Sequence, residues 1–209
     1  MKIERKPSGM LGANTYLVWD EKSLKGFIVD PGGFDDSLVS LIEKEAVKPE
    51  YIILTHGHGD HIGGVPKYKE LYPDIKLVAC EAEREFLLDP GVNESAELCF
   101  RELRLTADIY VADGDTLKVG DMELKFIHTP GHTPGGMCIY TDGALFSGDT
   151  LFRYSIGRTD FPGGDFKALI DSIKEKLFCL PDDTIVYPGH MDSTEIGKEK
   201  RHNPFVCIE

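Results

Sequence analysis

Three of the seven histidines in the chain fall within six consecutive residues, in the segment His56-Gly57-His58-Gly59-Asp60-His61. Imidazole nitrogens and carboxylate oxygens are ligands that zinc, iron and manganese bind readily. The alternative is a surface turn whose histidines are hydrogen-bonded locally. Such a turn would not explain why histidine and aspartate also follow three later apolar stretches of the chain. The segment therefore predicts a metal site.

Three later segments share one arrangement, in which an apolar stretch is followed by a glycine and then by a histidine or an aspartate. They are Pro130-Gly131-His132, Ser147-Gly148-Asp149 and Pro188-Gly189-His190. Active sites commonly gather beyond the carboxyl ends of strands, and glycine lets the backbone turn sharply there. We therefore expect these three segments to meet the histidine cluster.

The candidate ligands outnumber those that a single tetrahedral ion can use. Two divalent metal ions that share a carboxylate account for the number, and Asp149 is the predicted bridge. Because no cysteine is among the candidates, a closed structural zinc site of the cysteine type is disfavoured and a catalytic site is favoured. We expect zinc, with iron or manganese as alternatives. The predicted ligands are His56, His58, Asp60, His61, His132, Asp149 and His190.

The elements that must position these residues follow from hydrophobic periodicity. Many short strands with helices between them predict an α/β protein in which packed sheets are covered by helices. The expected helix 166–177 begins at Asp165 as its N-cap. Predicted strands cover residues 15–19, 27–29, 51–54, 76–78, 116–119, 123–127, 137–140, 144–146 and 185–187, and predicted helices cover 34–46, 67–71, 81–88, 97–104 and 166–177.

The composition indicates one domain over residues 1–209 and excludes several function classes. Lys and Arg number 23 against 36 Asp and Glu, and the net charge of −13 disfavours nucleic acid as a partner. No apolar run approaches the ~18 residues of a membrane span, and the N-terminus lacks a secretory signal, so we expect no membrane partner and a cytoplasmic location. Five cysteines without a C-x-x-C pair predict reduced core thiols. They are Cys80, Cys99, Cys138, Cys179 and Cys207.

The ordered set of ligand segments, together with Val29-Asp30-Pro31-Gly32-Gly33, resembles the metallo-β-lactamase superfamily over nearly the whole chain. The resemblance implies a four-layer αββα sandwich of two mixed β-sheets flanked by helices, with the metals at one sheet edge. It also implies that His56, His58 and His132 hold the first ion. By the same resemblance, Asp60, His61 and His190 hold the second ion, and Asp149 bridges the two.

Two further segments are similar to the glyoxalase II-like branch, which cleaves thioesters. They are Gly157-Arg158-Thr159-Asp160-Phe161-Pro162-Gly163-Gly164 and Arg201-x-Asn203-Pro204-Phe205. The chain departs from glyoxalase II in ending 19 residues after His190, so no separate C-terminal substrate-binding domain is expected. Resemblance to secreted β-lactamases is weaker, because those often carry a cysteine where Asp149 stands.

The resulting hypothesis is a metal-dependent hydrolase that cleaves a small-molecule thioester. Hydroxide formed at the two ions is expected to attack the carbonyl carbon of the thioester. Asp60 is expected to hold and orient this hydroxide. Alternatives are a mononuclear iron persulfide dioxygenase, a hydrolase of another ester or lactone, and a metal-binding domain without catalysis. The sequence leaves the physiological substrate and the oligomeric state open.

Other polar residues receive narrower interpretations. Asp30 is expected to orient a ligand histidine. Arg158 is either a structural ion-pair residue or a donor to an anionic group of the substrate, and it is the candidate substrate-binding residue. His128 is expected to be hydrogen-bonded within a strand. No role follows from the sequence for Glu195.

Overall fold

A six-stranded mixed sheet forms from the first half of the chain in this computed structural model, which describes residues 1–206. Its strands lie in sequence order; the first three are antiparallel, and the pairs from the third strand onward are parallel. Parallel neighbours bring the carboxyl ends of their strands to one edge, where the segment after the fourth strand carries His56. The strands are β1 (Lys2–Ser8), β2 (Ala13–Trp19), β3 (Lys25–Val29), β4 (Lys48–Ile53), β5 (Lys76–Cys80) and β6 (Ile109–Val111).

A second six-stranded mixed sheet forms from the rest of the chain, in the order β14-β13-β10-β9-β8-β7. Its pairs are antiparallel except for β10 and β13, which run parallel and so end at the same edge. Its strands are β7 (Thr116–Val119), β8 (Met122–His128), β9 (Met137–Thr141), β10 (Ala144–Gly148), β13 (Ile185–Pro188) and β14 (Thr194–Glu195); β11 (Leu151–Phe152) and β12 (Ser155–Ile156) form a separate ribbon.

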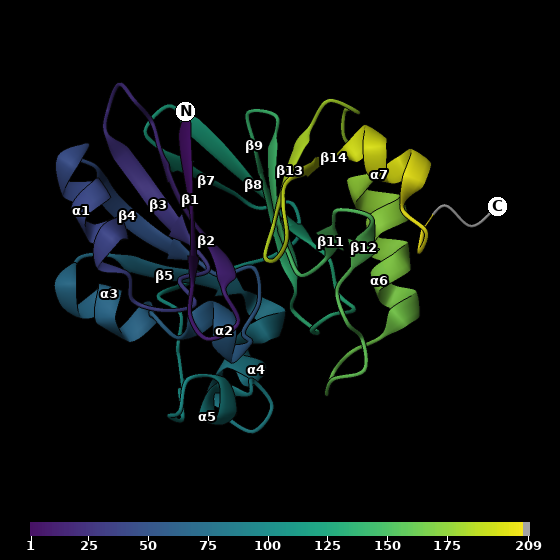
Figure 1. Cartoon of the computed structure of the whole chain (residues 1–209), viewed down its shortest axis with the longest axis horizontal. Coiled ribbons are helices and arrows are strands. Elements are labelled where there is room, and N and C mark those ends of the chain that lie inside the picture. Colours follow the sequence, from purple (N-terminus) through teal and green to yellow (C-terminus); the bar gives the residue numbers. More distant parts are fainter. Residues whose placement is uncertain (207–209) are drawn as a thin grey trace.

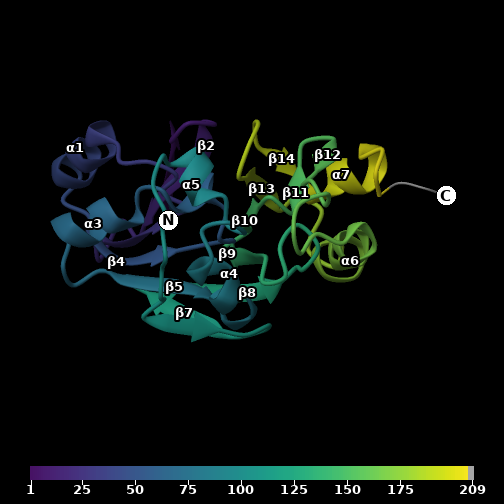
Figure 2. The same ribbon diagram turned by 90° about the horizontal axis from the view of Figure 1, so that it is seen from below.

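Side chains that alternate along the central strands create three layers of apolar packing. On β2, Tyr16 and Val18 face the cluster between the two sheets, whereas Leu17 and Trp19 face the cluster under the first helices. A third cluster packs the second sheet against the last helices. Figures 1 and 2 show α1 and α3 on one side, α6 and α7 on the other, and both sheets between them. The predicted αββα sandwich is therefore confirmed.

The helices begin and end mostly where the periodicity predicts. Asp35 caps α1 by accepting from the backbone N–H of Ser37, and Asp165 caps α6 by accepting from that of Ala168. The helices are α1 (Asp36–Lys44), α2 (Gly59–Ile62), α3 (Val65–Leu71), α4 (Arg84–Leu88, after a 3₁₀ turn at Glu81–Glu83), α5 (Ser95–Leu98), α6 (Phe166–Ser172, continued by a π turn at Ile173–Leu177) and α7 (Ile196–His202).

The predicted helix 97–104 is wrong. Helix α5 ends at Leu98, and Phe100 has a positive φ of 54° that a helix cannot accommodate. The side chains of Asn93 and Ser95 hydrogen-bond the backbone of Leu103 and hold this stretch in a loop. Short polar side chains that compete for backbone groups disfavour helix. Strands β1 and β6 and helix α7 were not predicted.

The cysteines only partly follow the expectation of buried thiols. Cys80 and Cys138 are buried, Cys99 is half-buried, and Cys179 is exposed. All four are free thiols, and Cys207 lies outside the described residues. Across residues 1–206, the helices are too short or too polar for any of them to cross a bilayer.

Candidate metal centre

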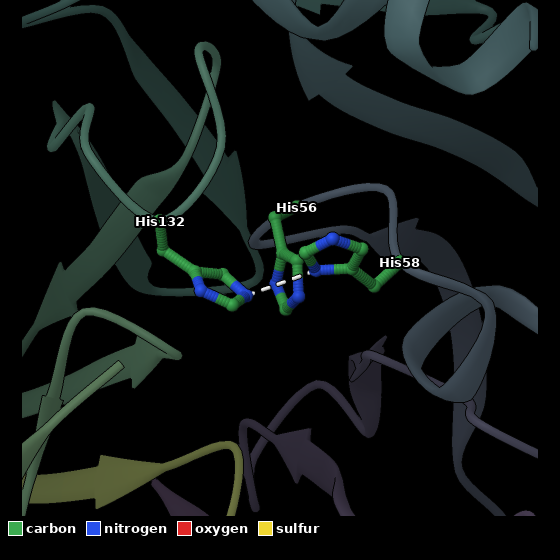
Figure 3. Close-up of side chains that lie close together, drawn as sticks. All are labelled: His56, His58 and His132. Carbon is green, nitrogen blue, oxygen red and sulfur yellow. Dashed lines mark hydrogen bonds between the residues drawn. The ribbon is translucent and has the colours of Figure 1, made fainter. Parts of the chain in front are cut away.

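Three histidines from both sheets converge at one edge of the sandwich. His56 follows β4, His58 precedes α2, and His132 lies in the loop after β8. The Nδ1 atom of His58 is 2.9 Å from Nε2 of His132, and one nitrogen from each of the three rings lies within 4.8 Å of the others. Figure 3 shows the three rings pointing toward a common space. The predicted first ligand group is thus assembled.

The rings of His132 and His56 are each oriented by an oxygen atom beside Nδ1. Nδ1–H of His132 donates to the carbonyl oxygen of Arg158 at 2.7 Å, so its Nε2 carries no proton and presents its lone pair toward His58. Nδ1 of His56 lies 3.1 Å from the Thr55 hydroxyl, and its buried Nε2 has no hydrogen-bond partner among residues 1–206. A buried imidazole nitrogen without a partner is costly, so this donor set fits a bound cation.

A second group lies beside the first. Asp60 and His61 belong to α2, and His190 follows β13. The His190 Nε2 atom is 3.2 Å from Asp60 Oδ2 and 3.3 Å from His61 Nε2. The structure therefore brings together the three residues predicted for the second ion.

Asp149 lies between the two groups. Its Oδ1 is 3.4 Å from Nε2 of His61, and its Oδ2 is 3.7 Å from Nε2 of His132. Oδ1 is buried and has no hydrogen-bond partner in the described part of the chain. One carboxylate that reaches both groups has the geometry that a bridging ligand requires.

Asp30 contacts His61 and Thr55 on the side away from the centre of the site. Its Oδ1 accepts a hydrogen bond from the Thr55 backbone N–H at 2.7 Å, and its Oδ2 accepts from the Thr55 hydroxyl at 2.5 Å. The same Oδ2 is 3.0 Å from Nδ1 of His61. Although Asp30 groups geometrically with His56 and His61, both of its oxygens are already used. It orients His61, as expected, and leaves Nε2 of that ring facing the centre.

The electrostatics of the site favour neutral rings in one group and a charge pair in the other. Burial, followed by the neighbouring imidazoles, lowers the pKa of His58 to about 3 and that of His56 well below its usual range. For His61, the carboxylates of Asp60 and Asp149 outweigh burial and raise the pKa to about 10. Neutral His56 and His58 keep the lone pairs that a metal ion needs.

Glycine is required where the ligand loops approach each other. A Cβ atom on Gly189 would lie 2.3 Å from Oδ1 of Asp149 and 2.7 Å from Cε1 of His61. Gly148 has a φ of +48°, and a Cβ there would lie 2.1 Å from the Thr55 hydroxyl. The strand, glycine and ligand pattern in the sequence therefore reflects close contact between loops.

A cavity of about 500 Å³ opens onto the two groups. Its polar lining includes Asp60, Asp149, Arg158 and Glu94. Of these four residues, Glu94 was not predicted from the sequence. Glu94 and Leu98 belong to the segment whose helix was misplaced, and no sequence signal marked them as pocket residues. The apolar lining consists of Leu11, Leu98, Phe152, Ile156, Phe161 and Met191.

Arg158 is fixed at the wall of this cavity. Its Nε and Nη2 atoms donate to the two oxygens of Asp160 at 2.9 and 2.7 Å, and its guanidinium lies 4.1 Å from the centroid of the Phe161 ring. Both interpretations of this residue therefore have a structural basis, since the ion-paired side chain also faces the pocket.

The remaining singled-out residues lie outside the ligand groups. Nε2 of His128 is 2.9 Å from the Pro134 carbonyl oxygen, which agrees with a hydrogen-bonded strand histidine. Glu195 lies at the junction of β14 and α7, where it forms an ion pair with Lys198. It is not among the residues that line the cavity.

Comparison with known proteins identifies the family. The family model described as the metallo-beta-lactamase superfamily matches residues 8–190. The probable metallo-hydrolase YqgX of Bacillus subtilis is 38% identical over 99% of this chain and 98% of its own length. The hydroxyacylglutathione hydrolase GloC of Haemophilus influenzae is 36% identical over the same shares.

Two solved structures share the fold at high similarity. BLEG-1, a B3 metallo-beta-lactamase, has a TM-score of 0.90 and 38% identity, covering 98% of this chain and 99% of that one. TTHA1623 in a di-iron-bound form has a TM-score of 0.81 and 34% identity, covering 95% and 98%. The matched family model spans every segment that supplies a side chain to the two ligand groups, and the chain belongs to the metallo-β-lactamase superfamily.

Proposed function

We propose that this chain is a metal-dependent hydrolase that holds two divalent ions and cleaves a small-molecule thioester. The observation that carries the proposal is the convergence of six side chains into two groups of three, with Asp149 between them. His56, His58 and His132 would hold one ion, and Asp60, His61 and His190 the other. Zinc fits this set of nitrogen and oxygen donors, and iron and manganese are alternatives.

Divalent ions at such a site supply a nucleophilic water at neutral pH and neutralise charge that develops on a carbonyl oxygen. Asp60 lines the cavity, so its carboxylate can accept a hydrogen bond from the attacking water and orient it toward the substrate. Phe152, Ile156 and Phe161 form an apolar wall of the cavity. A thiolate leaving group, with a conjugate acid of pKa ~8–9, needs no proton donor from the chain.

The comparisons support hydrolysis and suggest the first substrates to test. The relatives YqgX and GloC are described as a probable metallo-hydrolase and a hydroxyacylglutathione hydrolase. A hydroxyacyl thioester is therefore the leading candidate. A β-lactam is the second candidate, because BLEG-1 is described as a metallo-beta-lactamase and resembles this chain closely.

The test combines metal analysis with a matched substrate panel. We expect about two ions per chain and turnover of an S-hydroxyacylglutathione, abolished in His58→Ala. The panel includes the same acyl group on N-acetylcysteamine and a chromogenic cephalosporin. A protein that contains two ions and hydrolyses neither thioester would contradict the proposal. One iron per chain, with oxygen consumed in the presence of a persulfide, would replace it with the dioxygenase.

A further inference from the structure

Glu83 is a buried glutamate that the site described so far does not use. It ends the 3₁₀ turn Glu81–Glu83 that follows β5, and its residue is 1% exposed. The sequence offers no signal for it, because the surrounding run Glu81-Ala82-Glu83-Arg84-Glu85 has the composition of a solvated helix face. Buried carboxylates are rare without compensation, so its contacts require an explanation.

The two oxygens of Glu83 bind two different loops of the metal centre. Oε1 accepts a hydrogen bond from the backbone N–H of Gly57 at 2.8 Å, and Oε2 accepts one from the backbone N–H of Gly135 at 2.7 Å. Gly57 lies between His56 and His58, and Gly135 lies three residues after His132. One side chain thus connects the loop from the first sheet with the loop from the second.

Packing around Glu83 leaves no room for a side chain at either glycine. A Cβ on Gly57 would lie 2.9 Å from Cδ1 of Phe86, and a Cβ on Gly135 would lie 2.3 Å from the backbone nitrogen of Glu83. Nearby, the Met137 N–H donates to the Thr55 carbonyl at 2.8 Å, so the loops are joined at a second point. The two glycines therefore allow the loops to reach the carboxylate.

The charge of Glu83 has no basic partner. Among the described residues, no Lys, Arg or His forms an ion pair with it. Burial raises its pKa to about 7, and hydrogen bonds from the Gly57 N–H, the Thr133 side chain and the Gly135 N–H oppose that shift. Hydrogen-bond donors, and not a basic side chain, thus stabilise the anion, and the anion in turn fixes the Gly57 and Gly135 amides.

We propose that Glu83 is a positioning residue that sets the separation of His58 and His132 and thereby the metal affinity of the three-histidine group. The inference rests on the proposed metal binding and not on the proposed substrate. Partners behind metal ligands commonly contribute about 10–100-fold to metal affinity. Glu83 does not contact a ligand side chain. It binds the backbone N–H groups of Gly57 and Gly135, in the loops that carry His58 and His132.

The test isolates each ligand group in turn. Zinc affinity is measured by competition with a chromophoric chelator in a His190→Ala background, where the three-histidine group remains, and in a His58→Ala background, where Asp60, His61 and His190 remain. Glu83→Gln places an amide NH₂ against a backbone N–H donor and so breaks one of the two bonds. We expect about a 10–100-fold loss in the first background and less than about threefold in the second.

Glu199→Gln is the matched control. Glu199 is also fully buried and accepts the Tyr154 backbone N–H at 2.9 Å, away from the loops that Glu83 binds. We expect this variant to leave zinc affinity unchanged in both backgrounds. Unchanged affinity for Glu83→Gln in the first background, or an equal loss in both, would overturn the inference.

A second measurement keeps the inference testable if Glu83→Gln does not fold. In the wild-type apo protein, hydrogen exchange should show the Gly57 and Gly135 amides protected together. Exchange of either amide at the rate of an exposed loop would overturn the inference. Wild-type protein that binds two ions but hydrolyses no thioester would contradict the proposed function alone, whereas loss of affinity in Glu83→Gln would still support the role of Glu83.

Discussion

At the scale of single residues, the centre depends on how each imidazole is turned. Three rings are oriented by an oxygen behind them, from the Arg158 carbonyl, the Thr55 hydroxyl and the Asp30 carboxylate. Such partners fix which nitrogen faces the centre and raise its basicity. The imidazole side chain therefore supplies the ligand atom, and its hydrogen-bond partner determines which ring nitrogen faces the centre.

Asp60→Asn should lower kcat by about 10²–10⁴-fold, because the amide cannot hold the attacking water as a carboxylate does. The measurement is steady-state hydrolysis of the hydroxyacyl thioester, with metal content determined on the same sample. Asp192→Asn is the matched control, since Asp192 is an exposed surface aspartate paired with Arg5. Full activity in Asp60→Asn at equal metal content would contradict the role of Asp60.

Arg158→Ala distinguishes the two interpretations of that residue. If the guanidinium binds an anionic group of the carrier, KM for the glutathione thioester should rise about tenfold or more, as for loss of a hydrogen bond to a charged group. The N-acetylcysteamine thioester should be unaffected. Metal content should not change, because His132 is held by the backbone carbonyl of Arg158. Equal effects on both substrates would indicate a structural ion pair.

At the scale of elements, the ligands arrive on loops that leave strand ends at one edge. β4 leads to His56, β10 to Asp149 and β13 to His190, and glycines allow these loops to touch. The parallel pair β10 and β13 places Asp149 beside His190, since neighbouring parallel strands end together. The positions of His56, Asp149 and His190 therefore depend on the strand before each of them.

Gly189→Ala should disturb the centre through one added methyl group, since its Cβ would overlap Asp149 Oδ1 at 2.3 Å. We expect a free energy of unfolding lower by about 1–3 kcal/mol, together with reduced zinc content. Urea unfolding and elemental analysis provide the measurements. Gly91→Ala is the control, because the nearest atom to its Cβ would be 3.4 Å away. Normal zinc content in Gly189→Ala would contradict this prediction, because it would show that the loops can move apart to accommodate the added methyl group.

At the scale of the whole molecule, the two sheets each supply part of the site, so their mutual position matters. Asp20, after β2 of the first sheet, accepts hydrogen bonds from the Ser23 hydroxyl at 2.5 Å and from the Asp121 N–H in the β7–β8 turn at 3.3 Å. It thereby connects the sheets at a point distinct from the Glu83 contacts. The bond from Ser23, followed by that from the Lys22 N–H, lowers its pKa from 3.8 to about 2.

Asp20→Asn should therefore destabilise the fold in a pH-dependent way. Because the folded pKa lies below the unfolded value, the carboxylate stabilises the fold above pH 3.8, and this contribution is lost as the pH falls toward 2. The difference in free energy of unfolding between wild type and variant should be largest at pH 5–7 and shrink at pH 3. Urea unfolding at pH 7, 5 and 3 gives this difference. A pH-independent difference would contradict the assignment.

The sequence by itself determined the family of this protein and its candidate ligands. The type and order of the seven candidate ligands, and the apolar stretch and glycine before His132, Asp149 and His190, are local features, and the structure brings the seven residues together. The layered fold was also predictable, because alternation along β2 and the apolar spacing of α1 depend on short-range periods. Local patterns therefore sufficed for the class and for the candidate residues.

Only the tertiary structure decided which contacts hold the ligand loops together. The distances from Asp149 to His61 and His132, and the link that Glu83 makes between two ligand loops, involve residues dozens of positions apart. The loop 99–104 was mistaken for helix because Asn93 and Ser95 bind its backbone from outside any helical period. Long-range hydrogen bonds leave no periodic mark on a sequence, and for that reason they emerge only when the chain is folded.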